Sequence, residues 1–161
     1  MTAQRTKATA LRNKRLGEIG ECLAEQLLKR NHFVNVENLN SRHRNFPYAD
    51  FLAEKDAVRY VISVKIRNKF EFGPARRLNS RYKLGRHCYE LAAEAEIEYR
   101  AAAAFVSISL EERTFSAYFG RLSSLNGSKG ISMTPSGVSR YECIAHNEQH
   151  EFDCSDLRNE Y

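Results

Sequence analysis

The chain has 161 residues and a mass of 18.5 kDa, which is the size of one domain. Hydrophobic residues make up 42% of it and charged residues 28%, so the composition excludes collagen-like and intrinsically disordered chains. No apolar run approaches the roughly 20 residues of a membrane-spanning helix, and the basic N-terminal stretch lacks the apolar segment of a secretory signal. We therefore expect a single cytoplasmic domain over residues 1–161, in a prokaryotic, phage or organellar setting.

The first part of the chain predicts a basic flexible arm over residues 1–12, followed by an α/β core over residues 13–120. Apolar residues at helical spacing predict a helix over residues 13–31, which Asn31 ends. Alternating apolar and polar residues then predict three strands, of which the second and third form a hairpin. These strands are expected at residues 32–37, 48–54 and 59–67.

The core continues with a predicted helix over residues 80–99 and two strands over residues 101–110 and 114–120. A long helix between two strands is the usual crossover of a parallel pair, so we expect a mixed sheet flanked by helices. Residues 121–161 are expected as a C-terminal extension that starts with a loop rich in Ser and Gly over residues 123–137.

A basic segment follows the predicted hairpin, within a chain whose formal net charge is +5. Between Lys65 and Arg86 the only acid is Glu71, and the aromatic residues Phe70, Phe72 and Tyr82 interleave with the cations. Cations and aromatic side chains together are typical of a surface that binds nucleic acid, and the alternative is a solvated face. If the segment binds nucleic acid, the residues expected to contact it are Arg67, Lys69, Arg76, Arg77, Arg81 and Lys83.

A second cluster holds residue types that bind zinc. Cys143, His146, His150 and Cys154 follow one another at spacings of three, four and four residues. Four ligands along one helix do not close a tetrahedron, so zinc binding requires a turn between the two pairs. The alternative is a strand over residues 141–145 followed by a polar tail, and the sequence leaves both interpretations open.

Two charged residues stand within apolar strands. Lys65 lies in the segment YVISVKI, and Asp50 lies in the segment YADFLA. A buried ammonium or carboxylate is costly unless it is paired or lines a polar site. If the two strands pair, these side chains converge, either as a structural salt bridge or as a functional site.

The first helix supplies further carboxylates. Glu18, Glu21 and Glu25 form one stripe on it, bordered by Gly17 and Gly20. Glycine is unfavourable within a helix, so two of them indicate a close approach to another backbone. A carboxylate placed there beside the aspartate and lysine of the strands makes an oxygen-rich pocket suited to Mg²⁺.

The segments GECLAEQLLKRNHF and YADFLAEKDAVRYVISVKIR resemble the PD-(D/E)XK nuclease superfamily. This superfamily includes Holliday-junction resolvases, restriction enzymes and homing endonucleases. The resemblance implies a restriction-endonuclease-like αβββαβ core with a central mixed β-sheet flanked by helices. It also implies that Glu21 is the helical acid, Asp50 the central metal ligand and Lys65 the catalytic lysine.

The sequence departs from the superfamily pattern at two positions. Ser63 stands where the pattern has the first carboxylate of its tripeptide, and Ala49 stands where it has proline. A neutral hydroxyl binds Mg²⁺ less well than a carboxylate, so Glu21 or Glu18 is expected to supply the missing charge. Glu54 shares the strand face of the aspartate but lies about 7 Å along it, which makes it the weaker substitute.

The resemblance implies hydrolysis of phosphodiester bonds assisted by Mg²⁺, which Mn²⁺ can replace. Asp50, Glu21 and the Val64 carbonyl would hold one or two ions, Lys65 would orient or activate the attacking water, and Arg67 would hold a neighbouring phosphate. The implied partners are DNA and a second copy of the chain, as a homodimer or higher symmetric oligomer. Two alternatives remain: a DNA-binding pseudo-nuclease of the same fold without activity, and a zinc-stapled interaction protein.

Overall fold

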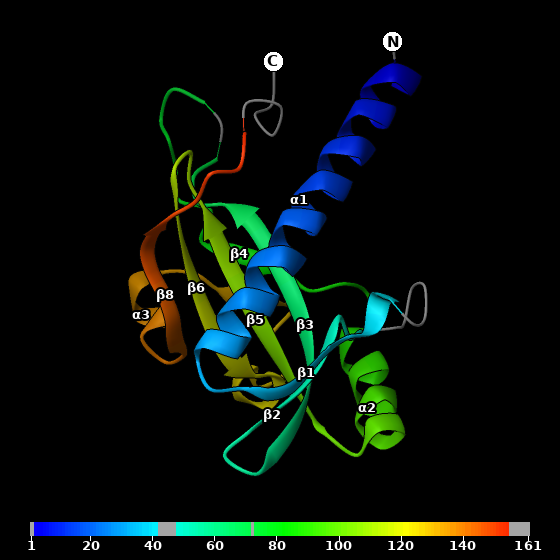
Figure 1. Ribbon diagram of the computed structural model, residues 1–161. Coiled ribbons are helices and arrows are strands. Elements are labelled where there is room, and N and C mark those ends of the chain that lie inside the picture. Colours follow the sequence, from blue (N-terminus) through cyan, green and yellow to red (C-terminus); the bar gives the residue numbers. More distant parts are fainter. Residues whose placement is uncertain (1, 42–47, 72, 155–161) are drawn as a thin grey trace.

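The computed structural model of the protein describes residues 2–41, 48–71 and 73–154. Its centre is a six-stranded sheet with the strand order β1-β2-β3-β5-β6-β8 (Figure 1). Strands β3 and β5 are parallel, and the other neighbouring pairs are antiparallel, so the expected mixed sheet is confirmed. The strands span Val34–Asn38 (β1), Phe51–Lys55 (β2), Val58–Asn68 (β3), Ala102–Leu110 (β5), Thr114–Arg121 (β6) and Glu142–Gln149 (β8).

The predicted hairpin is formed by β2 and β3. Asp56 and Ala57 connect the strands with φ angles of 53° and 63°. Two consecutive positive φ angles define a type I′ turn, whose twist matches that of an antiparallel pair. The ladder extends from the turn to the pair Phe51–Ile62, where β2 begins.

Helix α1 spans Thr2–Arg30 and covers one face of the sheet (Figure 1). Residues 2–12, which were expected as a flexible arm, are therefore helical. The physical reason is composition, because no Gly or Pro interrupts the chain before Gly17. The apolar stripe of α1 is buried against the sheet, as predicted, and comprises Leu16, Ile19, Leu23, Ala24, Leu27 and Leu28.

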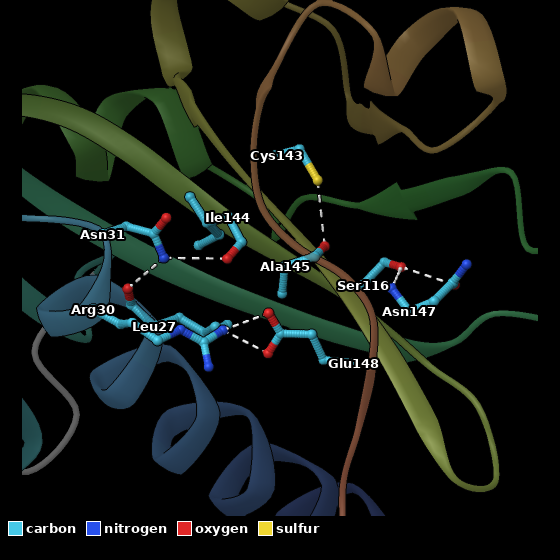
Figure 2. A network of polar contacts seen from close by, with 9 residues as sticks. All are labelled: Leu27, Arg30, Asn31, Ser116, Cys143, Ile144, Ala145, Asn147 and Glu148. Carbon is cyan, nitrogen blue, oxygen red and sulfur yellow. Dashed lines mark hydrogen bonds and ion pairs between the residues drawn. The ribbon is translucent and has the colours of Figure 1, made fainter.

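The C-terminal end of α1 is tied to the edge strand β8 (Figure 2). Arg30 Nη2 contacts Glu148 Oε1 at 2.6 Å, and Asn31 Nδ2 donates to the carbonyls of Leu27 and Ile144. Asn31 does end the helix, but the residue with left-handed backbone is His32, whose φ is 69°. These contacts fix the direction in which α1 crosses the sheet.

The other face of the sheet is covered by helix α2 and a two-stranded ribbon. Helix α2 spans Cys88–Tyr99, and the ribbon pairs β4 (Arg81–Lys83) with β7 (Gly130–Ser132). The helix expected over residues 80–99 is thus wrong in its first turns. Tyr82 is 1% exposed between two exposed basic neighbours, and this alternation belongs to a strand.

The region expected as a loop over residues 123–137 also contains regular structure. It holds most of the 3₁₀ helix η2 (Leu122–Leu125), all of β7 and most of helix α3 (Pro135–Val138). Residues of the expected C-terminal extension therefore contribute to both sheets. Among the described residues, no helix is both long and apolar enough to cross a membrane.

Candidate active site

Asp50 lies directly before β2, where the backbone ladder between β2 and β3 continues by one step. Its N–H donates to the Ile62 carbonyl at 2.8 Å, and its carbonyl accepts from Leu39 N at 2.9 Å. Its carboxylate Oδ2 accepts a hydrogen bond from the backbone N–H of Val64 at 2.7 Å. The carboxylate is therefore held against β3, next to the backbone of the residue that precedes Lys65.

The backbone that leads into Asp50 is strained at Tyr48. This residue has a φ of 75°, which is unfavourable for a side chain larger than glycine. Its hydroxyl donates to the carbonyl of Ala104 on β5 at 2.6 Å, and burial raises the pKa of the phenol above its ordinary value. Tyr48 thus fixes the entry to β2, a role that the sequence analysis missed.

Glu21 reaches the same place from α1 because Gly20 allows the helix to approach β3 closely. A Cβ atom on Gly20 would lie 2.7 Å from Ile66 Cγ2, closer than side chains pack. Burial raises the pKa of the Glu21 carboxyl above its ordinary value, and the negative charge of Asp50 raises it further. The two carboxylates predicted as a pair are therefore neighbours in the structure.

Asn40 connects these two carboxylates and was missed by the sequence analysis. It lies on the 3₁₀ helix η1 (Leu39–Ser41), and its Nδ2 donates to Glu21 Oε1 at 2.7 Å and to Asp50 Oδ1 at 3.1 Å. Its own N–H donates to Asn38 Oδ1 at 2.9 Å, and a hydrogen bond from Asn38 lowers the pKa of Glu21. The only sequence feature that could have indicated Asn40 was the polar segment NLNS, which follows a predicted strand.

Lys65 and Ser63 occupy the face of β3 that is turned away from α1. Lys65 is half-buried, and within the described part of the chain it forms no ion pair with Asp50. Its ammonium acts on the Cys88 thiol at the start of α2, opposing the rise in pKa that burial causes there. Of the two alternatives for this pair, the structural salt bridge is therefore not formed among the described residues. Ser63 is 5% exposed and adds no charge.

A small pocket of about 290 Å³ opens between α1 and the C-terminal end of β3. It is lined by Lys65 and Arg67 on the strand and by Asn13, Leu16 and Gly17 on the helix, together with Val64 and Ile66. Arg67 is exposed, and its Nη1 donates to the carbonyl of Ile66 at 2.7 Å. The remaining candidate substitute, Glu18, is exposed on α1 and raises the pKa of Glu21 through its charge.

The cations of the basic segment differ in how far they are engaged within the protein. Lys69 Nζ and the Arg76 guanidinium lie 5.4 and 4.9 Å from the centre of the Phe70 ring, so this aromatic side chain is engaged within the protein. Arg77 and Lys83 are exposed, and Arg81 donates to Ser128 Oγ.

The aromatic residues of this segment differ in their availability to a nucleic acid. Tyr82 is buried, which raises the pKa of its phenol to about 12, so the interpretation of Tyr82 as a stacking platform is wrong. Phe72 lies outside the described residues.

The four candidate zinc ligands are not gathered into a site. Cys143 Sγ contacts the carbonyl of Ala145 within β8 (Figure 2), and His146 is exposed on the same strand. His150 Nε2 contacts the carbonyl of Glu111 at 2.8 Å, and its ring lies between Phe115 and Phe152. Over the described ranges, no group of three or more His, Cys, Asp or Glu side chains is placed to hold a metal ion.

Comparison with known proteins decides the fold. No family model and no curated protein matches the sequence. Among solved structures, the chain matches Hjc, a Holliday junction resolvase from Archaeoglobus fulgidus, with a TM-score of 0.55 and 16% sequence identity. The match covers 79% of this chain and 95% of that chain. The chain has the restriction endonuclease-like fold.

This restriction endonuclease-like fold confirms the fold class that the two sequence segments implied. At 16% identity the likeness concerns the fold alone. The roles of Glu21, Asp50 and Lys65 are therefore argued from their own positions.

Proposed function

We propose that the protein is a metal-dependent DNA endonuclease that hydrolyses phosphodiester bonds. The observation that carries this proposal is the meeting of Glu21 and Asp50 at one amide, next to the strand that bears Lys65. These residues come from α1, from the start of β2 and from β3. A fold shared with a nuclease supports the proposal.

The donor set fits a hard cation such as Mg²⁺ or Mn²⁺. Glu21 and Asp50 offer carboxylate oxygens, which Mg²⁺ prefers, and the charge of Asp50 raises the pKa of Glu21, a repulsion that a cation relieves. The Asn40 amide now stands between them and has an oxygen of its own to present to a cation. The Val64 carbonyl is the proposed further ligand. A bound ion would acidify water and neutralise charge that develops on the phosphate.

Lys65 is proposed to orient the attacking water or to stabilise negative charge on the reacting phosphate. Lys65 is half-buried, forms no ion pair within the described residues, and is one of the residues around the small pocket at the C-terminal end of β3. Arg67 lies two residues further along the same face and is proposed to hold an adjacent phosphate. The exposed cations Arg76, Arg77, Arg81 and Lys83, with Lys69, would follow the DNA backbone.

The substrate proposed first is a four-way DNA junction, because the solved structure with this fold is a junction resolvase. A site-specific duplex cut is the second choice. Either reaction cuts two strands, so we propose a symmetric dimer in which each chain contributes one active site.

A second function, DNA binding without catalysis, is favoured by one observation. Ser63 occupies the position of an acid in the superfamily pattern, and its side chain is 5% exposed and uncharged. A site with one carboxylate fewer binds Mg²⁺ more weakly. This pseudo-nuclease and the endonuclease differ only in metal-dependent turnover.

The test is single-turnover cleavage of a synthetic four-way junction, a linear duplex and a plasmid in Mg²⁺ and in Mn²⁺. We expect Asp50→Asn and Lys65→Ala to lower the rate by about 10²–10⁴-fold, the usual effect of losing a positioned catalytic group. Asp56→Asn, in the exposed β2–β3 turn, is the matched control and should cut at the wild-type rate.

Each outcome separates the two functions. Equal cleavage by wild type and Lys65→Ala would remove this lysine from the mechanism. Binding of junction or duplex DNA without any cleavage in either metal would favour the pseudo-nuclease.

A further inference from the structure

The N-terminal half of α1 projects beyond the sheet (Figure 1). Within the described side chains of this helix, the first buried one is Leu16, and residues 7–15 are exposed or half-buried. At 1.5 Å per residue, the helical segment over residues 2–15 is about 21 Å long. Burial against the sheet therefore does not explain this part of the helix.

The charged residues of this segment are all basic. Residues 2–17 contain Arg5, Lys7, Arg12, Lys14 and Arg15 and no acid, and the three acids of α1 all come later. A helix N-terminus carries a partial positive charge and is stabilised by acids rather than by cations. This effect acts mainly within the first turn, where Arg5 opposes the dipole, and Arg15 Nη2 donates to the Asp153 carbonyl at 2.8 Å. Neither the dipole nor this contact explains Lys7, Arg12 and Lys14.

The cations of one face are aligned with the candidate metal site. Lys7, Lys14 and Glu21 are separated by seven residues each, and seven residues turn an α-helix by 700°, about 20° short of two turns. All three therefore lie on one face of α1. The lysines lie about 10 and 21 Å from Glu21 along the helix axis. One strand of B-DNA advances 3.4 Å per nucleotide along the duplex axis, so for a protein helix lying along that axis these distances correspond to about three and six nucleotides.

We propose that the N-terminal half of α1 is a second DNA-contacting element, which holds the backbone on one side of the cleaved phosphate. Lys7 and Lys14 neutralise phosphates there, and Arg12 adds charge on the flank of the helix. This inference rests on the proposed function, because it places a reacting phosphate at Glu21 and Asp50. It adds a binding surface that is distant in sequence from the basic segment after β3.

The experiment measures binding of a labelled four-way junction and a labelled duplex to the full chain in EDTA, from 50 to 300 mM NaCl. The variant is Lys7→Ala with Lys14→Ala, since alanine keeps the helix. The control is Lys29→Ala with Arg59→Ala, which removes the same charge from exposed positions at the opposite ends of α1 and β3. Circular dichroism checks that both variants keep their helices.

We expect the slope of log K against log salt to fall by about 2 in the variant, since each lost phosphate contact changes it by about 0.9. Affinity at 100 mM NaCl should drop at least about 10-fold in the variant and less than about 2-fold in the control. Lys7→Arg with Lys14→Arg should restore both values.

Two outcomes would overturn the inference, and they are distinguishable. Wild-type affinity and slope in the Lys7→Ala, Lys14→Ala variant would refute the α1 surface while leaving the nuclease proposal intact. Failure of the wild-type protein to bind either DNA would refute both proposals together.

Discussion

At the scale of single residues, the candidate site consists of two neighbouring carboxylates, which repel each other, and one amide that donates a hydrogen bond to both. Glu21 and Asp50 repel each other, and Asn40 donates one N–H to each of them. Burial raises the pKa of Glu21, and the repulsion from Asp50, which raises it further, is what a cation would relieve at the proposed metal site. A site that costs stability without its ligand is typical of functional centres.

This arrangement predicts the pH dependence of stability in the metal-free protein. The pKa of Glu21 is higher in the folded than in the unfolded chain, so its contribution to stability is present below the unfolded pKa of about 4.5 and is lost as pH rises through the folded value. Glu21→Gln removes this titration but retains a carbonyl to accept from Asn40. We expect the variant to gain stability relative to wild type as pH rises.

Urea unfolding in EDTA between pH 4 and pH 8 measures this difference. Glu25→Gln, at a half-buried position of α1 that pairs with Lys29, is the control and should not gain stability relative to wild type as pH rises. A difference between Glu21→Gln and wild type that is constant over this range would contradict the prediction.

At the scale of elements, the position of the site depends on how closely α1 packs on β3. Gly20 faces Ile66 and Val64 at contact distance, whereas a Cβ on Gly17 would have no atom within 4 Å. The two glycines, equivalent in the sequence, therefore have different roles. Gly20 sets the distance between the helical acid and the strand, and Gly17 lies in open space beside the pocket at Lys65.

The different surroundings of Gly20 and Gly17 predict that substitution by alanine changes the free energy of unfolding in opposite directions at the two positions. Gly20→Ala forces the buried Ile66 side chain or the helix to move, and we expect it to lower the free energy of unfolding by about 1–3 kcal/mol. Gly17→Ala should raise it by up to about 1 kcal/mol, because alanine favours the helix. Chemical denaturation measures both. A Gly20→Ala variant that is as stable as wild type or more stable would show that the close approach at Gly20 carries no constraint.

At the scale of the whole molecule, the sheet separates two apolar cores. One lies under α1, and the other lies under α2, η2 and the β4–β7 ribbon. Asp50 and Val64 meet where β2 begins and its pairing with β3 ends. Each chain gathers one such set of residues, so the proposed cut of two strands would need two chains.

A dimer is therefore expected on DNA. Light scattering coupled to size-exclusion chromatography should give twice the chain mass of 18.5 kDa, either for the free protein or for its complex with a four-way junction after subtraction of the DNA. A single copy in both samples would contradict the proposal of two symmetric active sites.

Several parts of this protein are determined by local sequence pattern. Alternation over residues 48–67 predicts the hairpin of β2 and β3, and the apolar run before Leu110 predicts the central strand β5. The segment around Glu21, Asp50 and Lys65 was sufficient for the resemblance to a nuclease superfamily. These features are readable because residues close in sequence carry the periodicity that a helix or strand imposes.

Other features, among them the β4–β7 ribbon and the contacts of Asn40 and Tyr48, were decided only by the tertiary structure. Strands β4 and β7 are three residues each and pair across α2, β5, β6 and η2, so neither has a pattern long enough to be recognised alone. Asn40 acquires its role because the fold places η1 between α1 and β2, and Tyr48 acquires its role through a carbonyl on β5. The sequence thus determined which residue types were available and where regular structure forms locally. Contacts between distant segments depend on how those elements pack, and these contacts decided which polar groups meet.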